Sequence, residues 1–374
     1  MRVLMTGGGT GGHVNPALAI AQTIKEKEPD SEIAFVGTPR GIENKLVPAA
    51  GYKLYHVDVM GLRRSLSLKN IKAAYLALTS PIKAKKIIKE FKPDVVIGTG
   101  GYVSWPVCKA AAQMGIPTAL HESNAVPGMA VRMLSGAADK IFLNFEKAGS
   151  GLNCPEKLLL VGCPMLGKFS SLSKEEARKK LGIPDSVKTV ILSFGGSLGA
   201  EKVNEAVLHL MKSYTGGKDE IHHTHATGAI EKEIAFGQFK EYGLDKYENL
   251  ELLEYIYDMP YRMAAADIVI CRAGALTVSE LSLAGKCAVF IPSPNVTDDQ
   301  QFKNANVLVE KDAAALIRET PALPEKLVET VKELCDLPEK RAQMENRIKD
   351  FAIGDANERI YREVRALVDN KKKK

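Results

Sequence analysis

Short apolar runs alternate with segments of helical length along almost the whole chain. Each run is three or four residues long and rich in valine, isoleucine and leucine, and examples lie at residues 3–5, 33–36, 95–97, 190–192 and 268–270. Strands that read as continuous apolar runs, separated by helices, are typical of parallel sheets covered by helices on both faces. The pattern therefore predicts an α/β fold.

Two glycine-rich turns divide this pattern into two halves. Residues 7–12 (GGGTGG) follow the first apolar run, and residues 195–199 (GGSLG) follow a run in the middle of the chain. Such a turn is typical of the first strand–helix connection of a Rossmann-type domain. We therefore expect two Rossmann-like domains, with their parallel sheets facing each other across a cleft. The predicted domains are residues 1–163 and 164–351.

A helix is predicted at the C-terminus, over about residues 352–369. Asp355 stands where a capping side chain is favoured, and Ile360, Val364 and Leu367 form an apolar stripe at helical spacing. The four lysines at 371–374 are expected to be disordered.

Composition and charge narrow the class of protein. A chain of 374 residues suits two domains, and 45% hydrophobic with 26% charged residues is ordinary for a globular protein. We find no apolar run long enough to cross a bilayer, and residues 1–7 resemble a strand entering a turn more than a signal peptide. The six cysteines form no CxxC pair, which favours reduced thiols in a cytoplasmic protein. A net charge of +6 permits an anionic partner, and nothing indicates a nucleic acid.

The most informative stretch is residues 266–280, where an apolar run, a small-residue turn and a helix start follow one another. The first N–H groups of a helix have no partner within it, so a strand, a glycine turn and a helix start together make an anion site. Glu280 lies within the first turns, where it could accept hydrogen bonds from sugar hydroxyls. This combination indicates a nucleotide-sugar pocket; an ordinary helix whose dipole favours Glu280 is the alternative.

The first glycine turn fits the dinucleotide pattern G-x-G-x-x-G through Gly7, Gly9 and Gly12. A dinucleotide site also needs an acidic residue near the end of the second strand, but Val36 is followed by residues 37–40 (GTPR). We therefore do not expect NAD. His13 closes the turn and is either a base near neutral pH or a histidine bonded to the backbone at a helix start.

Other loops offer polar groups but no clear metal site. Residues 98–106 and 121–128 follow apolar runs and should reach the carboxyl edge of the first sheet, although His121 and Glu122 could equally be structural. No Asp-x-Asp occurs, so a carboxylate-held Mg²⁺ is not indicated. His223 and His225 would share one face of a strand, but no third zinc ligand can be named.

A basic, amphipathic segment spans residues 62–92, with nine lysines and arginines against one glutamate. Leu68, Ile71, Tyr75 and Leu78 recur within it at helical spacing, beside Lys72. Such a helix could lie on an anionic membrane surface or bury its stripe on the sheet. A second helix is expected from Pro81, with core residues Ala84, Ile87, Ile88 and Phe91.

Taken together, these motifs resemble those of the MurG family of glycosyltransferases. The resemblance covers essentially the whole chain and is carried by residues 8–13 with Pro16, 100–104, 121–125, 195–200, 272–280, and Asp298 with Gln300, Gln301 and Asn304. It implies the GT-B fold and inverting, metal-independent transfer of N-acetylglucosamine from UDP-N-acetylglucosamine, with no cofactor. The implied acceptor is the 4-hydroxyl of an undecaprenyl-diphosphate-linked muramyl-pentapeptide (lipid I), giving lipid II.

The resemblance also implies a biological setting. The first domain would take the lipid acceptor and the second the UDP-sugar, with the last helix returning to the first domain. The protein would sit peripherally on the cytoplasmic face of the cell membrane, at an apolar patch ringed by basic residues. It would serve peptidoglycan synthesis and through it cell shape and division, with other cell-wall or division proteins as further partners. The rival readings are another GT-B lipid glycosyltransferase, a UDP-sugar epimerase and a non-catalytic nucleotide-sugar sensor.

Site residues carry over from the family position by position. His13 and Tyr102 would be catalytic, with Thr10 beside them on the acceptor side. Glu280 would hold the ribose, Ile256 would read uracil through its backbone, and Gln300, Gln301 and Asn124 would contact the donor sugar. The complete set of implied donor residues is Thr10, Gly11, Gly12, Asn124, Ser197, Ile256, Arg272, Ala275, Leu276, Thr277, Glu280, Gln300 and Gln301.

Three positions depart from the family pattern. Residues 161–166 (VGCPML) stand where the family usually has Gly-Asn-Pro followed closely by an arginine, so a cation near the diphosphate is missing. Leu198 replaces a usual glutamine, and Trp105 stands where a small residue is common. These departures concern phosphate contacts more than the activity.

Overall fold

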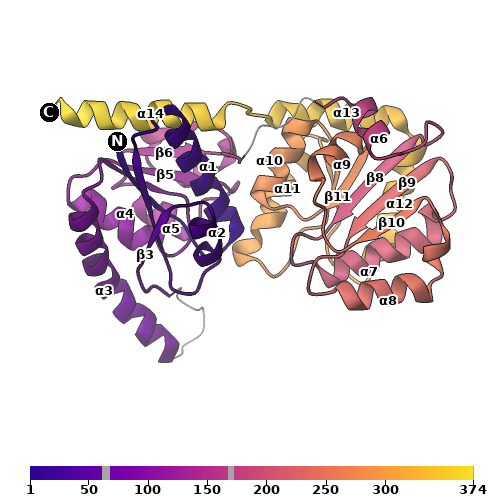
Figure 1. Ribbon diagram of the computed structural model, residues 1–374, viewed down its shortest axis with the longest axis horizontal. Coiled ribbons are helices and arrows are strands. Elements are labelled where there is room, and N and C mark those ends of the chain that lie inside the picture. Colours follow the sequence, from indigo (N-terminus) through magenta and orange to yellow (C-terminus); the bar gives the residue numbers. More distant parts are fainter. Residues whose placement is uncertain (61–67, 167–171, 374) are drawn as a thin grey trace. The chain divides into compact units, whose positions relative to one another are not determined.

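A computed structural model describes residues 1–60, 68–166 and 172–373 (Figure 1). The chain divides into two compact units. Unit 1 comprises Met1–Gly167 and Ile353–Lys374, and unit 2 comprises Lys168–Ala352. The second unit is thus inserted, as one continuous segment, before the last helix of the first.

The described residues of unit 1 form a seven-stranded parallel sheet in the order β3-β2-β1-β4-β5-β6-β7. Its strands are β1 (Arg2–Thr6), β2 (Glu32–Gly37), β3 (Lys53–His56), β4 (Val95–Gly98), β5 (Thr118–Glu122), β6 (Lys140–Leu143) and β7 (Leu158–Leu160). The connecting helices are α1 (Gly11–Lys27), α2 (Glu43–Ala49), α3 (Leu68–Phe91), α4 (Ser104–Gln113), α5 (Met129–Leu134) and, at the chain end, α14 (Ala356–Lys372).

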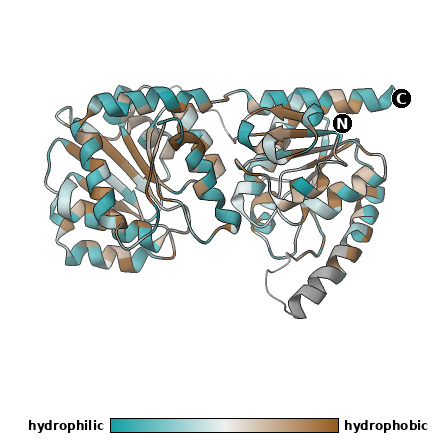
Figure 2. Cartoon of the chain, turned by 180° about the vertical axis from the view of Figure 1, so that it is seen from behind, coloured by the Kyte–Doolittle hydropathy of each residue, from teal (hydrophilic) through white to brown (hydrophobic). Residues whose placement is uncertain are grey.

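Helices cover this sheet on both faces, as the continuous apolar strands require. One core cluster joins the sheet to α3, α4 and α5 through residues such as Ile88, Val107 and Leu134. The other joins it to α1 and α14 through residues such as Ile20 and Ile360. Figure 2 shows the result as apolar strands enclosed by helices whose outer faces are polar. The predicted parallel α/β architecture is confirmed for this unit.

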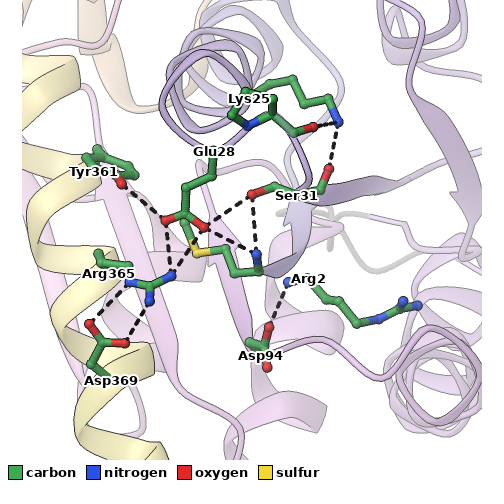
Figure 3. A network of polar contacts seen from close by, with 10 residues as sticks. Arg2, Lys25, Glu28, Ser31, Asp94, Tyr361, Arg365 and Asp369 are labelled. Carbon is green, nitrogen blue, oxygen red and sulfur yellow. Dashed lines mark hydrogen bonds and ion pairs between the residues drawn. The ribbon is translucent and has the colours of Figure 1, made fainter.

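The C-terminal helix α14 belongs to the packing of unit 1. Ile360, Val364 and Val368 are fully or almost fully buried in the same cluster as α1. Polar contacts add to this, because Glu28 at the end of α1 accepts hydrogen bonds from the Tyr361 hydroxyl and the Arg365 guanidinium, both at 3.1 Å (Figure 3). The predicted apolar stripe is therefore confirmed at Ile360 and Val364, whereas Leu367 is only partly buried against the same cluster and the next residue, Val368, is buried.

Two details predicted for α14 are wrong. Asp355 precedes the helix, but its side chain makes no capping hydrogen bond and pairs instead with Arg359 at 2.7 Å. The helix also continues through Lys372, so the lysine tail is ordered further than expected. Burial of Val368 explains this second difference, since it anchors the last turns on the sheet.

The segment around Pro81 forms one helix, not the two that were predicted. Helix α3 runs unbroken from Leu68 to Phe91 with Pro81 inside it. The half after Pro81 is held by Ala84, Ile88 and Phe91, which are buried as predicted, so tertiary packing outweighs the local cost of the proline. The predicted membrane residues lie in the first half, where the side chains of Leu68, Ile71 and Lys72 are outside the described residues.

The described residues of unit 2 form a six-stranded parallel sheet in the order β10-β9-β8-β11-β12-β13. Its strands are β8 (Thr189–Phe194), β9 (Ile221–Ala226), β10 (Leu250–Leu253), β11 (Ile268–Cys271), β12 (Cys287–Phe290) and β13 (Ala315–Leu316). Its helices are α6 (Lys174–Lys180), α7 (Glu201–Leu210), α8 (Lys232–Glu241), α9 (Met259–Ala265), α10 (Ala275–Ala284), α11 (Gln300–Val309), α12 (Leu323–Asp336) and α13 (Pro338–Ile348).

Unit 2 has its own core, and two predicted features lie inside it. Its main cluster packs β8, β11 and β12 against α7, α8 and α12. His223 and His225 share one face of β9, as predicted, and both contact the Ser193 hydroxyl at 2.9 Å. Burial lowers the pKa of His225 to about 4, so these rings are neutral structural groups. Among the described residues, no cluster of three or more His, Cys, Asp or Glu is arranged to hold a metal ion.

The strand orders place the functional loops. In each sheet the order reverses at one point, between β1 and β4 in unit 1 and between β8 and β11 in unit 2. Ligands of open α/β sheets bind outside the carboxyl ends of the strands at such a switch point. The six cysteines are free. None of the described helices is long and apolar enough to span a bilayer.

Candidate active site

The switch point of unit 1 is built from two glycine loops in backbone contact. The loop after β1 leads into α1, and the loop after β4 leads into α4. A Cβ on Gly101, which has φ +79°, would lie 2.3 Å from the carbonyl oxygen of Gly8. A Cβ on Gly100, with φ +111°, would lie 2.6 Å from Cδ2 of His13. Glycine is therefore required at both positions, and the His13 ring rests on the second loop.

His13 is held in the orientation that a general base needs. Its Nδ1 lies 3.1 Å from the Gly8 carbonyl oxygen and 3.3 Å from the Thr10 hydroxyl. A carbonyl oxygen can only accept, so Nδ1 carries the proton and Nε2 keeps its lone pair. Within the described part of the chain, Nε2 has no hydrogen-bond partner.

Burial lowers the pKa of His13 below its ordinary value of 6.5, although the Gly8 carbonyl and the charge of Glu43 act in the opposite direction. The imidazole is therefore neutral at physiological pH and able to take a proton. The second alternative given above for His13, a histidine bonded to the backbone at a helix start, is correct for Nδ1. The same bond is what leaves Nε2 available.

A buried carboxylate that the sequence did not reveal organises the first loop. Glu43 is fully buried and accepts hydrogen bonds from the Gly9 N–H at 3.0 Å and the Thr38 N–H at 2.8 Å. Burial alone would raise its pKa, but these bonds hold the pKa of Glu43 below its usual value. Glu43 lies in α2, seven residues after Val36. The sequence analysis looked for an acidic residue at the end of β2, and Glu43 lies beyond that position.

The second loop of unit 1 is fixed to the same framework. The Ser104 hydroxyl donates to the Gly100 carbonyl at 2.6 Å, and the Thr99 hydroxyl donates to the His13 carbonyl at 2.7 Å. Tyr102 is about half exposed at the tip of this loop. Thr10, Gly11, Gly12, His13 and Tyr102 are thus gathered at one edge of the sheet.

The loop after β5 reaches the same edge, and its two candidate residues differ in role. His121 is buried, with Nε2 3.0 Å from the Gly162 carbonyl, and burial lowers its pKa to about 4. It is a structural histidine. Glu122 positions Asn124, whose backbone N–H donates to it at 2.9 Å and whose amide group donates at 3.1 Å. His121 and Glu122 are therefore not partners of each other.

The switch point of unit 2 presents a second glycine loop and a helix start. The loop after β8 is held by the loop after β9, because Ile230 N–H donates to the Leu198 carbonyl at 3.1 Å and a Cβ on Gly199 would lie 2.3 Å from the Thr227 carbonyl oxygen. Ser197 is exposed in this loop. Next to it, α10 begins after Gly274, so the N–H groups of Ala275, Leu276 and Thr277 form its first turn.

Glu280 follows in the second turn of α10. Desolvation raises the pKa of Glu280 to about 7, well above the ordinary value of 4.5 for a glutamate. A carboxylate kept in such an environment is unfavourable unless a ligand supplies hydrogen bonds to its charged form. Perturbed groups of this kind concentrate at functional sites.

Arg272 and the glutamine pair complete the edge of the sheet. Arg272 is paired with Glu319 and donates to the Ile291 carbonyl at 3.0 Å, so it braces the ends of β11 and β12. Gln300 begins α11, and the side-chain oxygen of Gln301 accepts from the Ser293 N–H at 2.9 Å. Sequence reasoning missed Glu319, because it lies 47 positions from its partner in sequence.

The turn before Gln300 has an unusual backbone. Asp298 and Asp299 have φ values of 59° and 51°, a left-handed conformation that non-glycine residues adopt only at a cost. Asp298 pairs with Lys303 and Asp299 with Arg318, both at 3.0 Å. These two ion pairs tie the turn to α11 and to Arg318.

Comparison with known proteins decides the family. The glycosyltransferase family 28 N-terminal domain matches residues 3–143, and the C-terminal domain of the same family matches residues 190–360. An enzyme from Acetivibrio thermocellus, named UDP-N-acetylglucosamine–N-acetylmuramyl-(pentapeptide) pyrophosphoryl-undecaprenol N-acetylglucosamine transferase, is 42% identical over 99% of both chains. A Lactococcus lactis protein of the same name is 39% identical over 98% of this chain and 99% of its own. The chain belongs to the MurG family.

Solved structures agree with the MurG assignment. The crystal structure of Acinetobacter baumannii MurG matches with a TM-score of 0.79 and 29% identity over 98% of this chain and 99% of that one. The predicted GT-B fold is thereby confirmed. A UDP-GlcNAc 2-epimerase from Neisseria meningitidis matches with a TM-score of 0.66 at 17% identity, which shows a shared fold alone. The epimerase alternative is therefore not favoured.

Proposed function

We propose that the protein transfers N-acetylglucosamine from UDP-N-acetylglucosamine to the 4-hydroxyl of the undecaprenyl-diphosphate-linked muramyl-pentapeptide, giving lipid II. The observation that carries the proposal is the full-length relationship to transferases named for this reaction. The geometry supports the proposal at both switch points. In unit 1, His13 is oriented by the Gly8 carbonyl as a base would be. In unit 2, the start of α10 is suited to bind an anion, and Glu280 in the same helix has a raised pKa.

Unit 2 is proposed to bind the donor. The first turn of α10 and the loop around Ser197 would receive the diphosphate, because helix N-termini and glycine-loop amides direct N–H groups at anions. Glu280 would accept hydrogen bonds from the ribose hydroxyls, which stabilises its charged form. Gln300 and Gln301 would contact the sugar, and Arg272 would keep the two strand ends in place rather than contact phosphate directly.

Unit 1 is proposed to bind the acceptor. The acceptor oxygen attacks C1 of the donor sugar while the bond from C1 to the UDP oxygen breaks, which inverts the configuration. Nε2 of His13 takes the hydroxyl proton, and UDP departs with the bonding electrons. The charge that develops on the diphosphate would be stabilised by the amides of the α10 start, and one such preorganised donor is worth about 3 kcal/mol.

Unit 1 is also proposed to attach to the cytoplasmic face of the cell membrane. Tyr75, Leu78 and Ile82 on α3 are 64%, 76% and 60% exposed, so this part of the stripe is not buried on the sheet. Lysines follow along the same helix, at positions 83, 85, 86 and 89. Exposed apolar side chains among basic residues fit an anionic lipid surface, where the acceptor resides.

The deciding experiment measures UDP release from UDP-N-acetylglucosamine with and without the lipid-linked muramyl acceptor. We expect release only when the acceptor is present, with one disaccharide formed per UDP. Conversion of the donor sugar without acceptor would instead support an epimerase. Binding of UDP-N-acetylglucosamine with no release under either condition would support a sensor, and transfer to a different lipid would point to a related GT-B enzyme.

A further inference from the structure

One peptide group lies between two ionisable side chains at the first glycine loop of unit 1. The carbonyl oxygen of Gly8 is 3.1 Å from Nδ1 of His13. The N–H of Gly9 donates to Oε2 of Glu43 at 3.0 Å. The C=O of Gly8 and the N–H of Gly9 belong to the same planar unit of the backbone. His13 and Glu43 are therefore joined through this single peptide group, although they lie on different helices.

Glu43 carries a buried charge that, among the described residues, no lysine or arginine neutralises. Its Oε1 accepts the N–H of Thr38 at 2.8 Å and the Thr38 hydroxyl at 2.7 Å, so both carboxylate oxygens accept hydrogen bonds. Arg40 and Lys45, its basic neighbours in the sequence, are exposed. Burial would raise the pKa of Glu43, but the hydrogen bonds hold it below its usual value, so the side chain is ionised at neutral pH. The field of such a charge is felt by the groups bonded to it.

The backbone around Glu43 encloses the carboxylate closely. A Cβ on Gly8 would lie 2.6 Å from Oε1 of Glu43, and a Cβ on Gly37 would lie 2.5 Å from Cγ of the same side chain. A Cβ on Gly41 would overlap its Oε2. Glycine at these three positions leaves the room that the carboxylate occupies. The close fit fixes the position of the carboxylate relative to the Gly8–Gly9 peptide group.

The shared peptide group links the charge of Glu43 to the basicity of His13. Hydrogen bonds in a chain polarise one another, so an amide whose N–H is bonded to a carboxylate has a carbonyl oxygen that is a stronger acceptor. The Gly8 carbonyl therefore holds the Nδ1 proton of His13 more firmly, which favours the imidazolium that forms when Nε2 takes a proton. Burial lowers the pKa of His13, and of the charged groups among the described residues Glu43 is the one that opposes this effect.

We propose that Glu43, the Gly8–Gly9 peptide group and His13 form a relay in which Glu43 is a positioning residue for the base. The negative charge of Glu43 acts through the polarised peptide group and stabilises the positive charge that His13 acquires when Nε2 takes the proton of the acceptor hydroxyl. No proton moves along the relay, because the Gly9 nitrogen and Nδ1 of His13 both keep their hydrogens. The inference rests on the proposed function, since it needs His13 to be the base of the transfer.

The first test measures the pH dependence of kcat for the full chain and two variants. Glu43→Gln removes the charge at nearly constant size, and kcat should fall by about tenfold or more, the loss typical when a group that orients a functional histidine from behind is removed. The acidic limb should also move to lower pH, since His13 loses the charge that favours its protonated form. Thr38→Val removes another hydrogen bond to Glu43 but leaves the Gly9 contact, so its limb should stay in place. A lower kcat in Glu43→Gln with an unmoved limb would show a purely structural role and overturn the relay.

The second test needs no turnover and reads His13 directly, by NMR of the full chain labelled at histidine, with the His13 signals assigned by their absence in His13→Ala. The unaltered protein should carry the neutral His13 proton on Nδ1, and Glu43→Gln should lower the pKa of His13. A proton on Nε2 in the unaltered protein would overturn the relay even where Glu43→Gln does not fold, and so would a pKa of His13 that the substitution leaves unchanged. Near-normal turnover in His13→Ala, with both NMR results as expected, would instead overturn the proposed role of His13 as the base, and with it the part of the relay in the transfer.

Discussion

At the scale of single residues, the proposed mechanism depends on two side chains, His13 and Glu280, whose protonation is set by their surroundings. His13 is kept neutral by burial, with Nδ1 bonded to the Gly8 carbonyl and, among the residues that the structure describes, no hydrogen-bond partner at Nε2. Glu280 is kept close to half-protonated at neutral pH by desolvation. Both effects are consequences of burial near the start of a helix, and both can be measured.

Replacing His13 by alanine should lower kcat by about a hundredfold or more, because the acceptor hydroxyl loses its base. The Kd of UDP should not change, since the groups proposed to contact the ribose and the diphosphate lie in unit 2. Steady-state kinetics with the lipid acceptor, together with calorimetry for UDP, separates the two quantities. Near-normal turnover in this variant would remove His13 from the catalytic role.

The pH profile offers a separate check of His13. A base acts in its neutral form, and the lowered pKa keeps it neutral below pH 6.5. The acidic limb of kcat should therefore lie below pH 6.5. A limb centred above that value would contradict the burial of the ring at the moment of reaction.

Glu280 should couple UDP binding to pH. The ribose hydroxyls favour the ionised carboxylate, so UDP affinity should fall as the pH drops through about 7. We expect the Kd to rise by about tenfold between pH 8 and pH 6, since each pH unit below the pKa removes most of the remaining carboxylate. Glu280→Gln should bind UDP more weakly and lose this dependence, and Glu205→Gln on the exposed face of α7 is the matched control.

The same carboxylate should reduce the stability of the unliganded protein. The folded-state pKa of about 7 lies above the ordinary value of 4.5, so the folded state prefers the protonated form and loses stability as the pH rises from about 4.5 to 7. Glu280→Gln should therefore be more stable than the parent at pH 8, by up to about 3 kcal/mol. Urea unfolding at pH 5 and pH 8 measures the difference, and equal stabilities at pH 8 would contradict it.

At the scale of secondary-structure elements, the last helix and the longest helix have contrasting surfaces. The apolar stripe of α14 is buried on unit 1, whereas the described stripe of α3 before and at Ile82 is exposed. Both helices carry apolar residues at helical spacing, and burial distinguishes the core contact of α14 from the candidate membrane contact of α3.

Ile360→Ala should destabilise the protein by about 2–4 kcal/mol, because it removes a fully buried side chain between α14 and α1. The exposed neighbour Arg362→Ala should change the free energy of unfolding by no more than about 0.5 kcal/mol. Chemical denaturation of both variants gives the comparison. Similar values for the two would show that α14 is not part of the cooperative core.

Replacing Tyr75, Leu78 and Ile82 by serine should weaken binding to anionic vesicles by about tenfold or more, since three exposed apolar side chains would no longer enter the lipid surface. The measurement is sedimentation with vesicles that contain an anionic lipid. Ile230→Ser with Ile234→Ser, an exposed apolar pair in unit 2, serves as the control. Unchanged sedimentation of the α3 variant would exclude this face as the membrane contact.

At the scale of the whole molecule, the two units differ in how the chain builds them. Unit 2 is one continuous segment with its own core cluster, whereas unit 1 is completed only by the helix that follows unit 2. All of unit 2 therefore lies between α14 and the rest of unit 1 along the chain.

A fragment of residues 172–352 should fold and bind UDP with an affinity similar to that of the full chain, because its core and its proposed donor residues are contained within it. It should show no transfer, since His13 is absent. Thermal unfolding and calorimetry test the first two expectations. A cooperative fragment that does not bind UDP would place essential donor contacts in unit 1, where Thr10 and Asn124 are candidates.

The sequence predicted much of the fold because its signals are local. The apolar runs predicted both parallel sheets. The glycine turns predicted the loops at both switch points, because a glycine loop between a strand and a helix is specified by a few neighbouring residues. The break expected at Pro81 was wrong, because the buried residues after it stabilise a continuous helix. Glu43 and Glu319 were not predicted. Glu43 binds the Gly9 N–H, 34 positions away in sequence, and Glu319 pairs with Arg272, 47 positions away.

By itself the sequence determined the class of fold, the two glycine-rich centres and the candidate chemistry at each, because periodicity and turn residues act over a few positions. Only the tertiary structure decided that Nδ1 of His13 is the nitrogen bonded to the backbone and that desolvation raises the pKa of Glu280 to about 7. Those properties depend on burial and on hydrogen bonds between segments far apart in the chain, and burial is a property that no local pattern specifies.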